Sequence, residues 1–202
     1  MLPIAASAAA VNGDISTPDG GLILSPALPL LGGRYRYVRS VGEGAFSQIL
    51  VCDDTYAVDG DNQPREGCDS LVAIKVMNQK YTDIGAQELV MLRYLNKMDS
   101  SDCARIVRSI AAFEFHGHFC IVMVRLGSSL LHWRRQQHLS LSRLPASMGD
   151  AQTLMIRPLR KLVIQLLSSL LFLHRRGVIH ADMKPENILT VRISIETPKF
   201  QY

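Results

Sequence analysis

Residues 178–189 contain three side chains of complementary chemistry. In the sequence VIHADMKPENIL, Asp182 is followed by Lys184 two residues later and by Asn187 five residues later, and Pro185 restricts the backbone between them. A carboxylate can orient and deprotonate a hydroxyl group, an ammonium group can stabilise a phosphoryl group in transfer, and an amide oxygen can bind magnesium. The loop is therefore a candidate for phosphoryl-transfer chemistry.

A glycine-rich turn in the first quarter of the chain is the second candidate. The sequence VGEGAFSQI places Gly42, Gly44 and Ser47 between two strand-like segments. Glycine lets backbone amides approach phosphate oxygens, and the flanking strands favour a flap over phosphates instead of a dinucleotide fold, whose glycines open a helix. An ordinary hairpin turn is an equal interpretation of these residues alone.

The third candidate is a lysine within an apolar strand. Lys75 ends the sequence VAIK, and an unpaired ammonium group in an apolar cleft would lose its hydration without compensation. Glu88 is the expected anionic partner, because it lies on an amphipathic helix predicted for residues 83–97, with Asp83 placed to cap it. The alternative interpretation of Glu88 is a glutamate on a helix surface.

These groups need a scaffold, and the hydrophobic pattern predicts strands followed by helices. A second amphipathic helix is expected to begin near Pro158 and to end at Gly177, a residue suited to a helix C-cap. The strands are expected near residues 35–41, 46–51, 71–77, 106–115 and 119–124. The apolar stripe of the second helix, which is expected to be buried, consists of Leu159, Leu162, Val163, Leu166, Leu170 and Leu173.

An acidic segment, residues 53–70, separates the second and third strands. Asp59 and Asp61 have the spacing of the first two calcium ligands of an EF-hand. Pro64 occupies the place of the turning glycine, and no helices flank the segment. A solvated hairpin loop is therefore favoured over a metal site.

The composition excludes several classes of protein. With 202 residues, 48% of them hydrophobic, the chain can bury a sizeable core. The net charge of +4 is too small and dispersed to indicate a nucleic-acid or anionic-membrane partner. The longest apolar stretch, residues 162–173, is far shorter than the roughly 20 residues that a bilayer requires. The four cysteines show no metal-ligand spacing, which indicates reduced thiols of the cytoplasm or nucleus.

The first 33 residues differ in composition and hydrophobic pattern from the rest of the chain. Residues 1–33 are rich in Ala, Gly, Pro and Leu without a sustained period of two or 3.6, and the apolar start lacks the basic segment of a signal peptide. We expect residues 1–33 to be a disordered leader and residues 34–202 to form the folded domain.

Taken together, the motifs resemble those of eukaryotic protein kinases. The glycine-rich turn, VAIK, the helix glutamate and the HxDxKPEN loop occur in kinase order and at kinase spacing over about residues 34–192. KPEN favours the serine/threonine type. HAD, the GEGAFS flap and the long acidic hairpin are similar to the dual-specificity, homeodomain-interacting and pre-mRNA-processing kinases of the CMGC group.

The resemblance implies a fold and a division into lobes. The expected class is α+β with a protein-kinase-like fold, in which residues 34–124 form a five-stranded antiparallel N-lobe sheet with one main helix. A hinge would follow at residues 124–127, and residues 128–202 would form a partial, mostly helical C-lobe.

The resemblance also implies roles for the candidate residues. Lys75 would hold the α- and β-phosphates of ATP and pair with Glu88. Asp182 would be the catalytic base, Lys184 would contact the γ-phosphate, and Asn187 would be a ligand of Mg²⁺. The other ATP-binding positions would be Gly42, Gly44 and Ser47 over the triphosphate, Val41, Ile49 and Ala73 around adenine, Met123 as gatekeeper, and the backbone of Val124 and Leu126.

Three functions remain open at this point. The first is an ATP- and magnesium-dependent kinase with a protein substrate, no nucleic-acid or membrane partner and an oligomeric state that the sequence leaves undetermined. The second is a catalytically inactive kinase-like module that binds a partner. The third is a small-molecule phosphotransferase, which the KPEN sequence disfavours.

Several positions depart from the family pattern. Ala181 replaces the usual arginine before the catalytic aspartate, so the loop lacks a guanidinium group for a phosphorylated activation segment. Ser47 replaces the third glycine, a change compatible with a hairpin tip. The DFG aspartate expected about twenty residues beyond Asp182 does not occur before Tyr202, which indicates a truncated kinase domain that exposes part of its leucine stripe.

Overall fold

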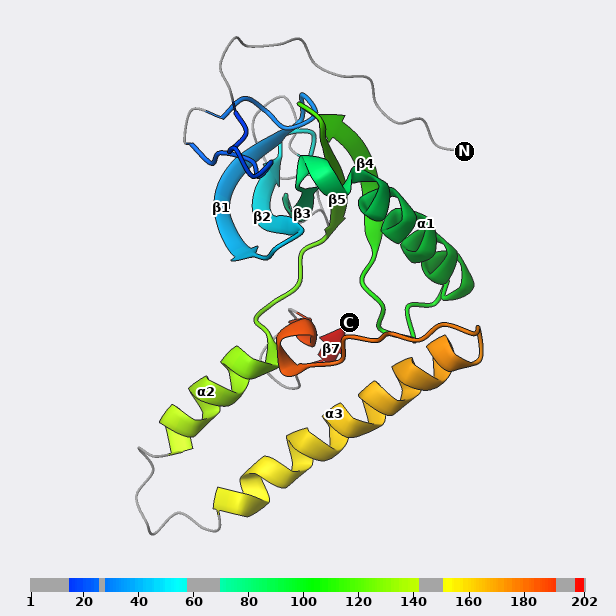
Figure 1. Ribbon diagram of the computed structural model, residues 1–202. Helices are drawn as coiled ribbons and strands as arrows, with labels where there is room; N and C mark the ends of the chain where they lie inside the picture. Colours follow the sequence, from blue (N-terminus) through cyan, green and yellow to red (C-terminus); the bar gives the residue numbers. More distant parts are fainter. Residues whose placement is uncertain (1–14, 26–27, 58–69, 142–150, 192–198, 202) are drawn as a thin grey trace. The chain divides into compact units, whose positions relative to one another are not determined.

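The computed structural model describes residues 15–25, 28–57, 70–141, 151–191 and 199–201 (Figure 1). These residues fall into two compact units. Unit 1 lies within residues 1–97 and 108–125, and unit 2 lies within residues 98–107 and 126–202. The change of unit after residue 125 falls in the predicted hinge, whereas residues 98–107 group with unit 2.

Unit 1 is built on a five-stranded antiparallel sheet with the order β1-β2-β3-β5-β4. The predicted α+β class and the five-stranded sheet are therefore confirmed. A two-residue turn at His116 and Gly117, with φ angles of 48° and 78°, joins the last two strands, as in the primed hairpin turns that match strand twist. The strands are β1 (Tyr35–Glu43), β2 (Ser47–Asp54), β3 (Leu71–Met77), β4 (Ser109–Phe115) and β5 (His118–Val124).

The main helix of unit 1 is α1 (Thr82–Met98), which follows the short 3-10 helix η1 (Gln79–Tyr81). The predicted helix is confirmed, although Asp83 lies inside its first turn and does not precede it. Gly85 permits close packing on the sheet, because a Cβ atom there would lie 2.5 Å from the Met77 Cγ atom and 3.0 Å from the Phe119 ring. Close contact with β3 and β5 therefore requires glycine at this position.

The leader prediction is wrong for the described residues before β1. Leu22 and Leu31 are 2% and 0% exposed and belong to the main core of unit 1, together with apolar side chains of the sheet such as Leu50 and Ile74. Residues 15–23 form a small hairpin in which the Ile23 amide donates to the Ile15 carbonyl. We call residues 15–25 the strap. The sheet supplies an apolar face that buries scattered leucines, so a regular sequence period is unnecessary.

Unit 2 contains α2 (Leu130–Leu141), α3 (Ala151–His174), the 3-10 helix η2 (Pro185–Asn187) and the antiparallel strand pair β6 (Leu189–Val191) and β7 (Lys199–Gln201). The predicted start of the second helix is wrong, because α3 begins seven residues before Pro158. Its predicted end is confirmed. Gly177 has a φ angle of +69° and its amide donates to the His174 carbonyl, while the Val178 amide donates to the Leu173 carbonyl. This is the Schellman arrangement.

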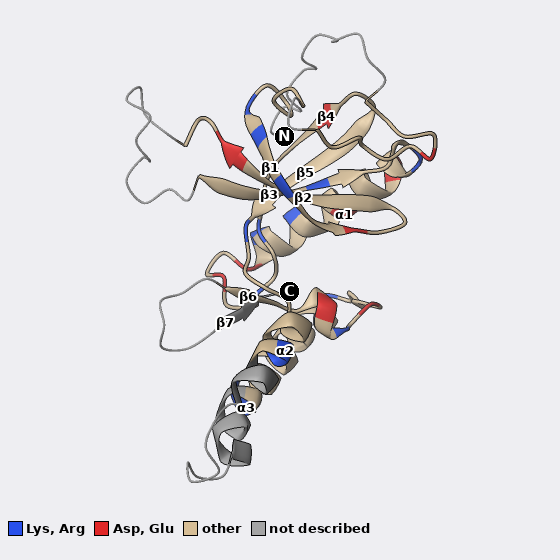
Figure 2. Cartoon of the chain, turned by 90° about the vertical axis from the view of Figure 1, so that its left-hand side faces the viewer, with Lys and Arg blue, Asp and Glu red and all other residues tan. Residues whose placement is uncertain are grey.

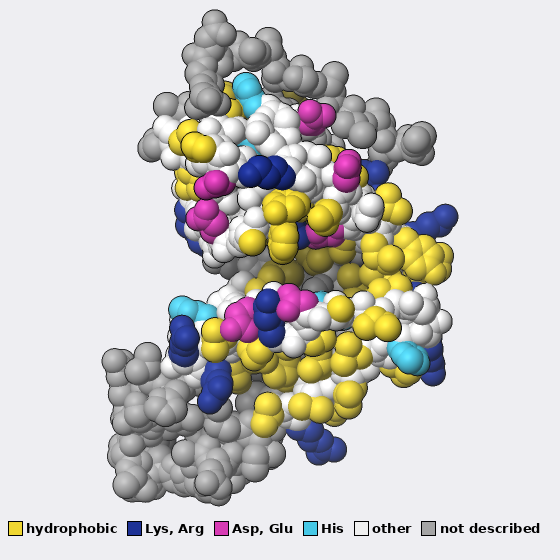
Figure 3. Space-filling view, viewed as in Figure 1, with side chains coloured by type: hydrophobic (Ala, Val, Ile, Leu, Met, Phe, Trp, Pro, Cys, Tyr) yellow, Lys and Arg dark blue, Asp and Glu magenta, His cyan; other side chains and the backbone are white. Residues whose placement is uncertain are grey.

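The apolar stripe of α3 is only partly buried in unit 2. Leu162 and Leu173 are buried, and Leu162 packs with Ile188, Leu130 and Leu166. Figure 3 shows hydrophobic side chains gathered along the described part of α3. The exposed ones are Leu159, Val163, Ile164, Leu167 and Leu171. Among the described residues, no helix has the length and apolar character needed to cross a membrane.

Candidate functional site

Lys75 and Glu88 form an ion pair between the middle of the sheet and α1. The Lys75 Nζ atom lies 2.8 Å from Oε1 and 2.6 Å from Oε2 of Glu88, so one ammonium group donates to both carboxylate oxygens. The two side chains are 23% and 32% exposed. Charge-assisted bonds at these distances are among the stronger polar contacts in proteins. The structure thus brings together the pair that the sequence predicted.

The register of the strands places the predicted adenine positions beside Lys75. Ile49 lies opposite Lys75 across β2 and β3, and directly opposed residues of antiparallel strands share a face. Ala73, two residues before Lys75, has the same orientation and lies opposite Met123. Ile49 and Ala73 are partly buried, Met123 is 8% exposed, and Val41 is 48% exposed. An apolar strip therefore adjoins the ion pair on one face of the sheet.

The glycine-rich turn joins β1 to β2. The Gly44 amide donates to the Ser47 carbonyl at 2.9 Å, and Gly42 pairs with Ile49. Neither Gly42 nor Gly44 has a positive φ angle. A Cβ atom on Gly42 would meet no atom within 4 Å, and one on Gly44 would meet only the Ser47 carbonyl oxygen at 3.8 Å. Neither backbone conformation nor packing among the described residues requires glycine here, which favours the approach of an external group over the hairpin-turn interpretation.

The tip of this turn is held by residues that the sequence interpretation missed. Asn78, directly after β3, donates its backbone amide to the Phe46 carbonyl at 2.9 Å and its side-chain amide to the Ala45 carbonyl at 3.1 Å. The Phe46 ring packs edge-on against Tyr81 with 4.9 Å between the ring centroids. An asparagine after a strand is a common turn residue, so its type gave no signal of this contact.

The two backbone positions predicted to bind adenine belong to different units. Val124 ends β5, and its amide donates to the Arg108 carbonyl at 2.9 Å. Leu126 is the first residue of unit 2 after β5 and is partly buried. Neither residue makes a contact that identifies a ligand, and their predicted role stays a prediction.

The loop before η2 and η2 itself bring the other three candidates together within unit 2. The Lys184 Nζ atom lies 2.9 Å from Oδ2 of Asp182, and the side-chain amide of Asn187 donates to the same oxygen and to the Asp182 carbonyl, both at 2.9 Å. Figure 2 shows acidic and basic residues adjacent in this loop. The ammonium group of Lys184, followed by the amide of Asn187, holds the pKa of the Asp182 carboxyl below its usual value. Asp182 is therefore ionised at neutral pH.

The backbone of this loop is strained at Ala181. Its φ angle is +61°, in the left-handed region that a residue with a Cβ atom rarely adopts. The Asp182 amide donates to the His180 carbonyl at 2.9 Å across this residue. On the other side the loop is anchored by Ile188, which is 5% exposed and whose carbonyl accepts from the Leu130 amide at 2.7 Å. The anchor and the tight bend together hold Asp182 outward.

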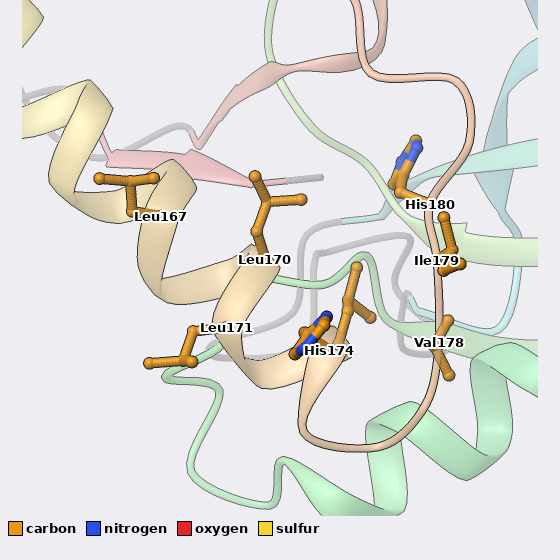
Figure 4. Close-up of a pocket in the computed structure, with 8 residues that line it drawn as sticks. Leu167, Leu170, Leu171, His174, Val178, Ile179 and His180 are labelled. Atoms are coloured by element: carbon orange, nitrogen blue, oxygen red, sulfur yellow. The ribbon is translucent and has the colours of Figure 1, made fainter.

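Unit 2 also contains an apolar hollow of about 530 Å³ next to this loop (Figure 4). The candidate residues Asp182, Lys184 and Asn187 do not line it. It is lined by the C-terminal half of α3 and the segment that follows, namely Leu167, Leu170, Leu171, Leu173, His174, Val178, Ile179 and His180. Its only polar side chains are the two histidines, so its chemistry is that of a hydrophobic contact surface.

No group of three or more His, Cys, Asp or Glu side chains that could hold a metal ion occurs among the described residues. Most of the acidic segment that raised the calcium alternative, residues 58–69, lies outside them. At its start, Asp54 accepts two bonds of 2.6 Å from the Arg34 guanidinium group, and Asp53 pairs with Arg36 at 3.2 Å. These two carboxylates are thus used in ion pairs of the sheet.

Comparison with known proteins agrees with this geometry. A sequence model of the protein kinase domain matches residues 35–196. The chain belongs to the protein kinase family. The curated relatives of this kinase chain include the mouse dual specificity protein kinase CLK4, which is 31% identical over 88% of the chain, and the Arabidopsis thaliana serine/threonine-protein kinases AFC2 and AFC1, 32% and 33% identical over 78% and 84%.

These relatives bear out the resemblance predicted from the motifs, including the dual-specificity group indicated by HAD and the GEGAFS flap. The aligned region is 33% of the CLK4 sequence and 32% of the AFC2 sequence, so the chain spans about a third of the length of the curated relatives it matches.

Proposed function

We propose that this protein is an ATP-dependent protein serine/threonine kinase, which transfers a phosphoryl group from Mg-ATP to a hydroxyl group of a protein substrate. The ion pair between Lys75 and Glu88 is the observation that carries the proposal. A lysine held on a sheet by a helix glutamate, beside an apolar strip and next to a glycine-rich turn, is the arrangement that kinases use for the phosphates of ATP.

The residues of unit 1 fit a nucleotide. The backbone at Gly42 and Gly44 is open to an approaching group, and neither the φ angles nor internal packing explains why these residues are glycines. The Lys75 ammonium group is partly exposed and keeps its third N–H, beyond the two bonds to Glu88, for a phosphate oxygen. The remaining predicted positions are Ser47 at the turn, Val41, Ile49 and Ala73 for adenine, Met123 as gatekeeper, and the backbone of Val124 and Leu126.

The residues of unit 2 fit a magnesium ion and an acceptor hydroxyl group. Asn187 uses its NH₂ group in both bonds to Asp182, which leaves its side-chain oxygen as an acceptor for a hard cation. The contacts of the Asp182 carboxylate with the described residues all use Oδ2, so Oδ1 can accept the proton of a substrate hydroxyl group. When bound, Mg-ATP supplies the phosphoryl group and the cation that neutralises its charge.

The lowered pKa of Asp182 keeps its carboxylate ionised at neutral pH. A carboxylate that is ionised at neutral pH can always accept a hydrogen bond from a hydroxyl group, but it is a weak base. We infer that Asp182 mainly orients the acceptor hydroxyl group and takes its proton late in the transfer. Lys184, whose ammonium group lies at Oδ2, would then move its contact to the γ-phosphate. KPEN favours serine and threonine acceptors, and we propose a site of action in the cytoplasm or nucleus.

The test measures nucleotide binding and phosphoryl transfer with the full chain. Titration of ATP with and without Mg²⁺ should show saturable binding that Lys75→Met abolishes, and transfer to a protein substrate should disappear in Asp182→Asn. Binding without transfer would identify an inactive nucleotide-binding module. Absence of binding would contradict the proposal.

A further inference from the structure

We propose that the strap, residues 15–25, positions the glycine-rich turn for nucleotide through Gln79 and Asn78. The inference rests on the proposed function, because it concerns how firmly the turn is held over phosphates. All the contacts that carry it lie within unit 1. The strap, whose Leu22 is 2% exposed in the core of this unit, is the dark-blue segment beside the sheet in Figure 1.

The first step is the contact between the strap and η1. The Gln79 amide donates to the Gly20 carbonyl at 2.9 Å, and Gly20 is buried with a φ angle of +84°. The Gln79 side-chain amide donates to the Ser16 hydroxyl and to the His116 carbonyl, both at 3.0 Å. The first strand of the strap hairpin, at Ser16, and its turn, at Gly20, therefore both bind one residue of η1.

The second step is a buried hydrogen-bond chain that orients this contact. The Nδ1 atom of His118, which is 0% exposed, lies 2.9 Å from the Met77 carbonyl and so must donate to it. Its Nε2 atom then accepts from the Ser16 hydroxyl at 2.9 Å, while that hydroxyl accepts from Gln79. Each hydrogen donated in this network has one acceptor, so the strap has a defined position relative to the ends of β3 and β5.

The third step leads from η1 to the turn. Asn78 directly precedes Gln79 and holds the Phe46 and Ala45 carbonyls through its backbone and side-chain amides. Tyr81, the last residue of η1, packs against the Phe46 ring. A displacement of Gln79 must therefore move the residues that hold the tip of the turn. Gly44 closes the turn itself through Ser47, but that bond does not tie the tip to the sheet.

The strap variant for the test is Gly20→Val. Valine cannot adopt the φ angle of +84° without strain, and its Cβ atom would lie 3.6 Å from the Gln79 amide nitrogen, so this variant should displace the Gly20 carbonyl from Gln79. Gly33→Val is the matched control. Gly33 has a φ angle of +68° and open space around its Cβ position, so it imposes the same kind of strain on the same unit away from η1.

Hydrogen exchange of the nucleotide-free chain is the first measurement. Gly20→Val should increase the exchange rate of the Asn78 amide, which donates to Phe46, and Gly33→Val should not. The second measurement is steady-state transfer. Gly20→Val and Asn78→Ala should each raise KM for ATP by about 2- to 12-fold, the effect of one neutral hydrogen bond, with kcat unchanged. Gln79→Ala, which keeps the backbone bond to the strap, should also raise the Asn78 exchange rate and KM for ATP. It replaces Gly20→Val in the test if that variant does not fold.

Two results would overturn the inference. One is an exchange rate of the Asn78 amide that is unchanged in both Gly20→Val and Gln79→Ala. The other is an equal increase of that rate in Gly33→Val. If the wild-type chain binds no ATP, the proposed function fails, but the exchange measurement still decides whether the strap holds the turn.

Discussion

The two units of the chain hold their candidate residues in different ways. In unit 1, Lys75 and Glu88 are partly buried and come from a strand and a helix that pack over a continuous core. In unit 2, Asp182, Lys184 and Asn187 lie within six consecutive residues, and the Asp182 side chain is 63% exposed. The sheet unit thus depends on long-range packing for its geometry, and the loop of unit 2 depends on local hydrogen bonds.

This difference implies that a substitution in unit 2 can abolish activity without lowering stability, whereas in unit 1 the two losses occur together. A substitution in the exposed loop should remove function while the fold remains intact. A substitution in the sheet core should lower stability, and the arrangement around Lys75 should be lost with it. The following predictions test that contrast.

The largest expected effect is that of Asp182→Asn on phosphoryl transfer. Loss of the carboxylate should lower kcat on the order of 10²- to 10⁴-fold, because the amide cannot accept the hydroxyl proton. The melting temperature should stay that of the wild type, since the side chain is exposed. Glu114→Gln, an exposed carboxylate on β4, is the control and should change neither quantity. A large fall in melting temperature for Asp182→Asn would show that the loop is part of a cooperative core.

The second effect is on stability in the sheet. Ile74→Ala, at a position that is 0% exposed in β3, should lower the free energy of unfolding by about 2–5 kcal/mol, because it leaves a cavity in the core. Leu171→Ala, at a position that is 48% exposed on α3, should change it by less than about 0.5 kcal/mol. Urea denaturation of both variants measures this difference, and equal losses would remove the contrast between the units.

A smaller effect of opposite sign is expected at Ala181. Because its φ angle is +61°, Ala181→Gly should relieve strain and raise the free energy of unfolding by up to about 1 kcal/mol. Ala86→Gly, within α1, should lower it by about 1 kcal/mol, since glycine is a poor helix residue. Denaturation curves decide the signs. A loss of stability in Ala181→Gly would mean that the alanine methyl group makes a contact worth more than the strain.

The smallest effect is a pH dependence due to His118. Burial lowers the pKa of this imidazole in the folded chain. The unfolded chain takes up a proton near the ordinary value of about 6.5, and the folded chain does so only at lower pH. Folding stability should therefore fall as pH decreases below about 6.5, until the folded pKa is reached.

Melting temperatures measured between pH 5.5 and 7.5 test this dependence. The melting temperature should depend less steeply on pH in His118→Gln. A dependence as steep as that of the wild type would show that other groups cause it. The pKa of the exposed Asp182 carboxyl is also lowered, so this group titrates at more acidic pH and should not contribute to the slope in this range.

Much of the sheet and the helices α1 and α3 could be predicted because their signals are local. Strand alternation, the 3.6-residue period of α1 and the capping glycine at position 177 depend on neighbouring residues, and the structure agrees with them. The start of α3 was misplaced because a proline suits the first turn of a helix, whereas Pro158 lies within α3. The strap was missed because its burial depends on the sheet face that it covers.

The candidate residues themselves were predictable because phosphoryl-transfer chemistry requires particular residue types at short spacings. Asp182, Lys184 and Asn187 are close in sequence and must be close in space. Asn78 and His118 could not have been recognised, because an asparagine or a histidine has no role until the fold supplies its partners. Ala45 and Phe46 reach Asn78 only through the pairing of β2 with β3.

The sequence by itself determined the family of this chain and the candidate groups for phosphoryl transfer, since residue type and spacing set what each group can bind. Only the tertiary structure decided that the Lys75 ammonium group donates to both oxygens of Glu88, that the glycines of the turn are not needed for its own conformation, and that residues 15–25 pack on the sheet. The reason is physical. Burial and hydrogen-bond pairing depend on which segments meet, and segments distant in the sequence meet only in the folded chain.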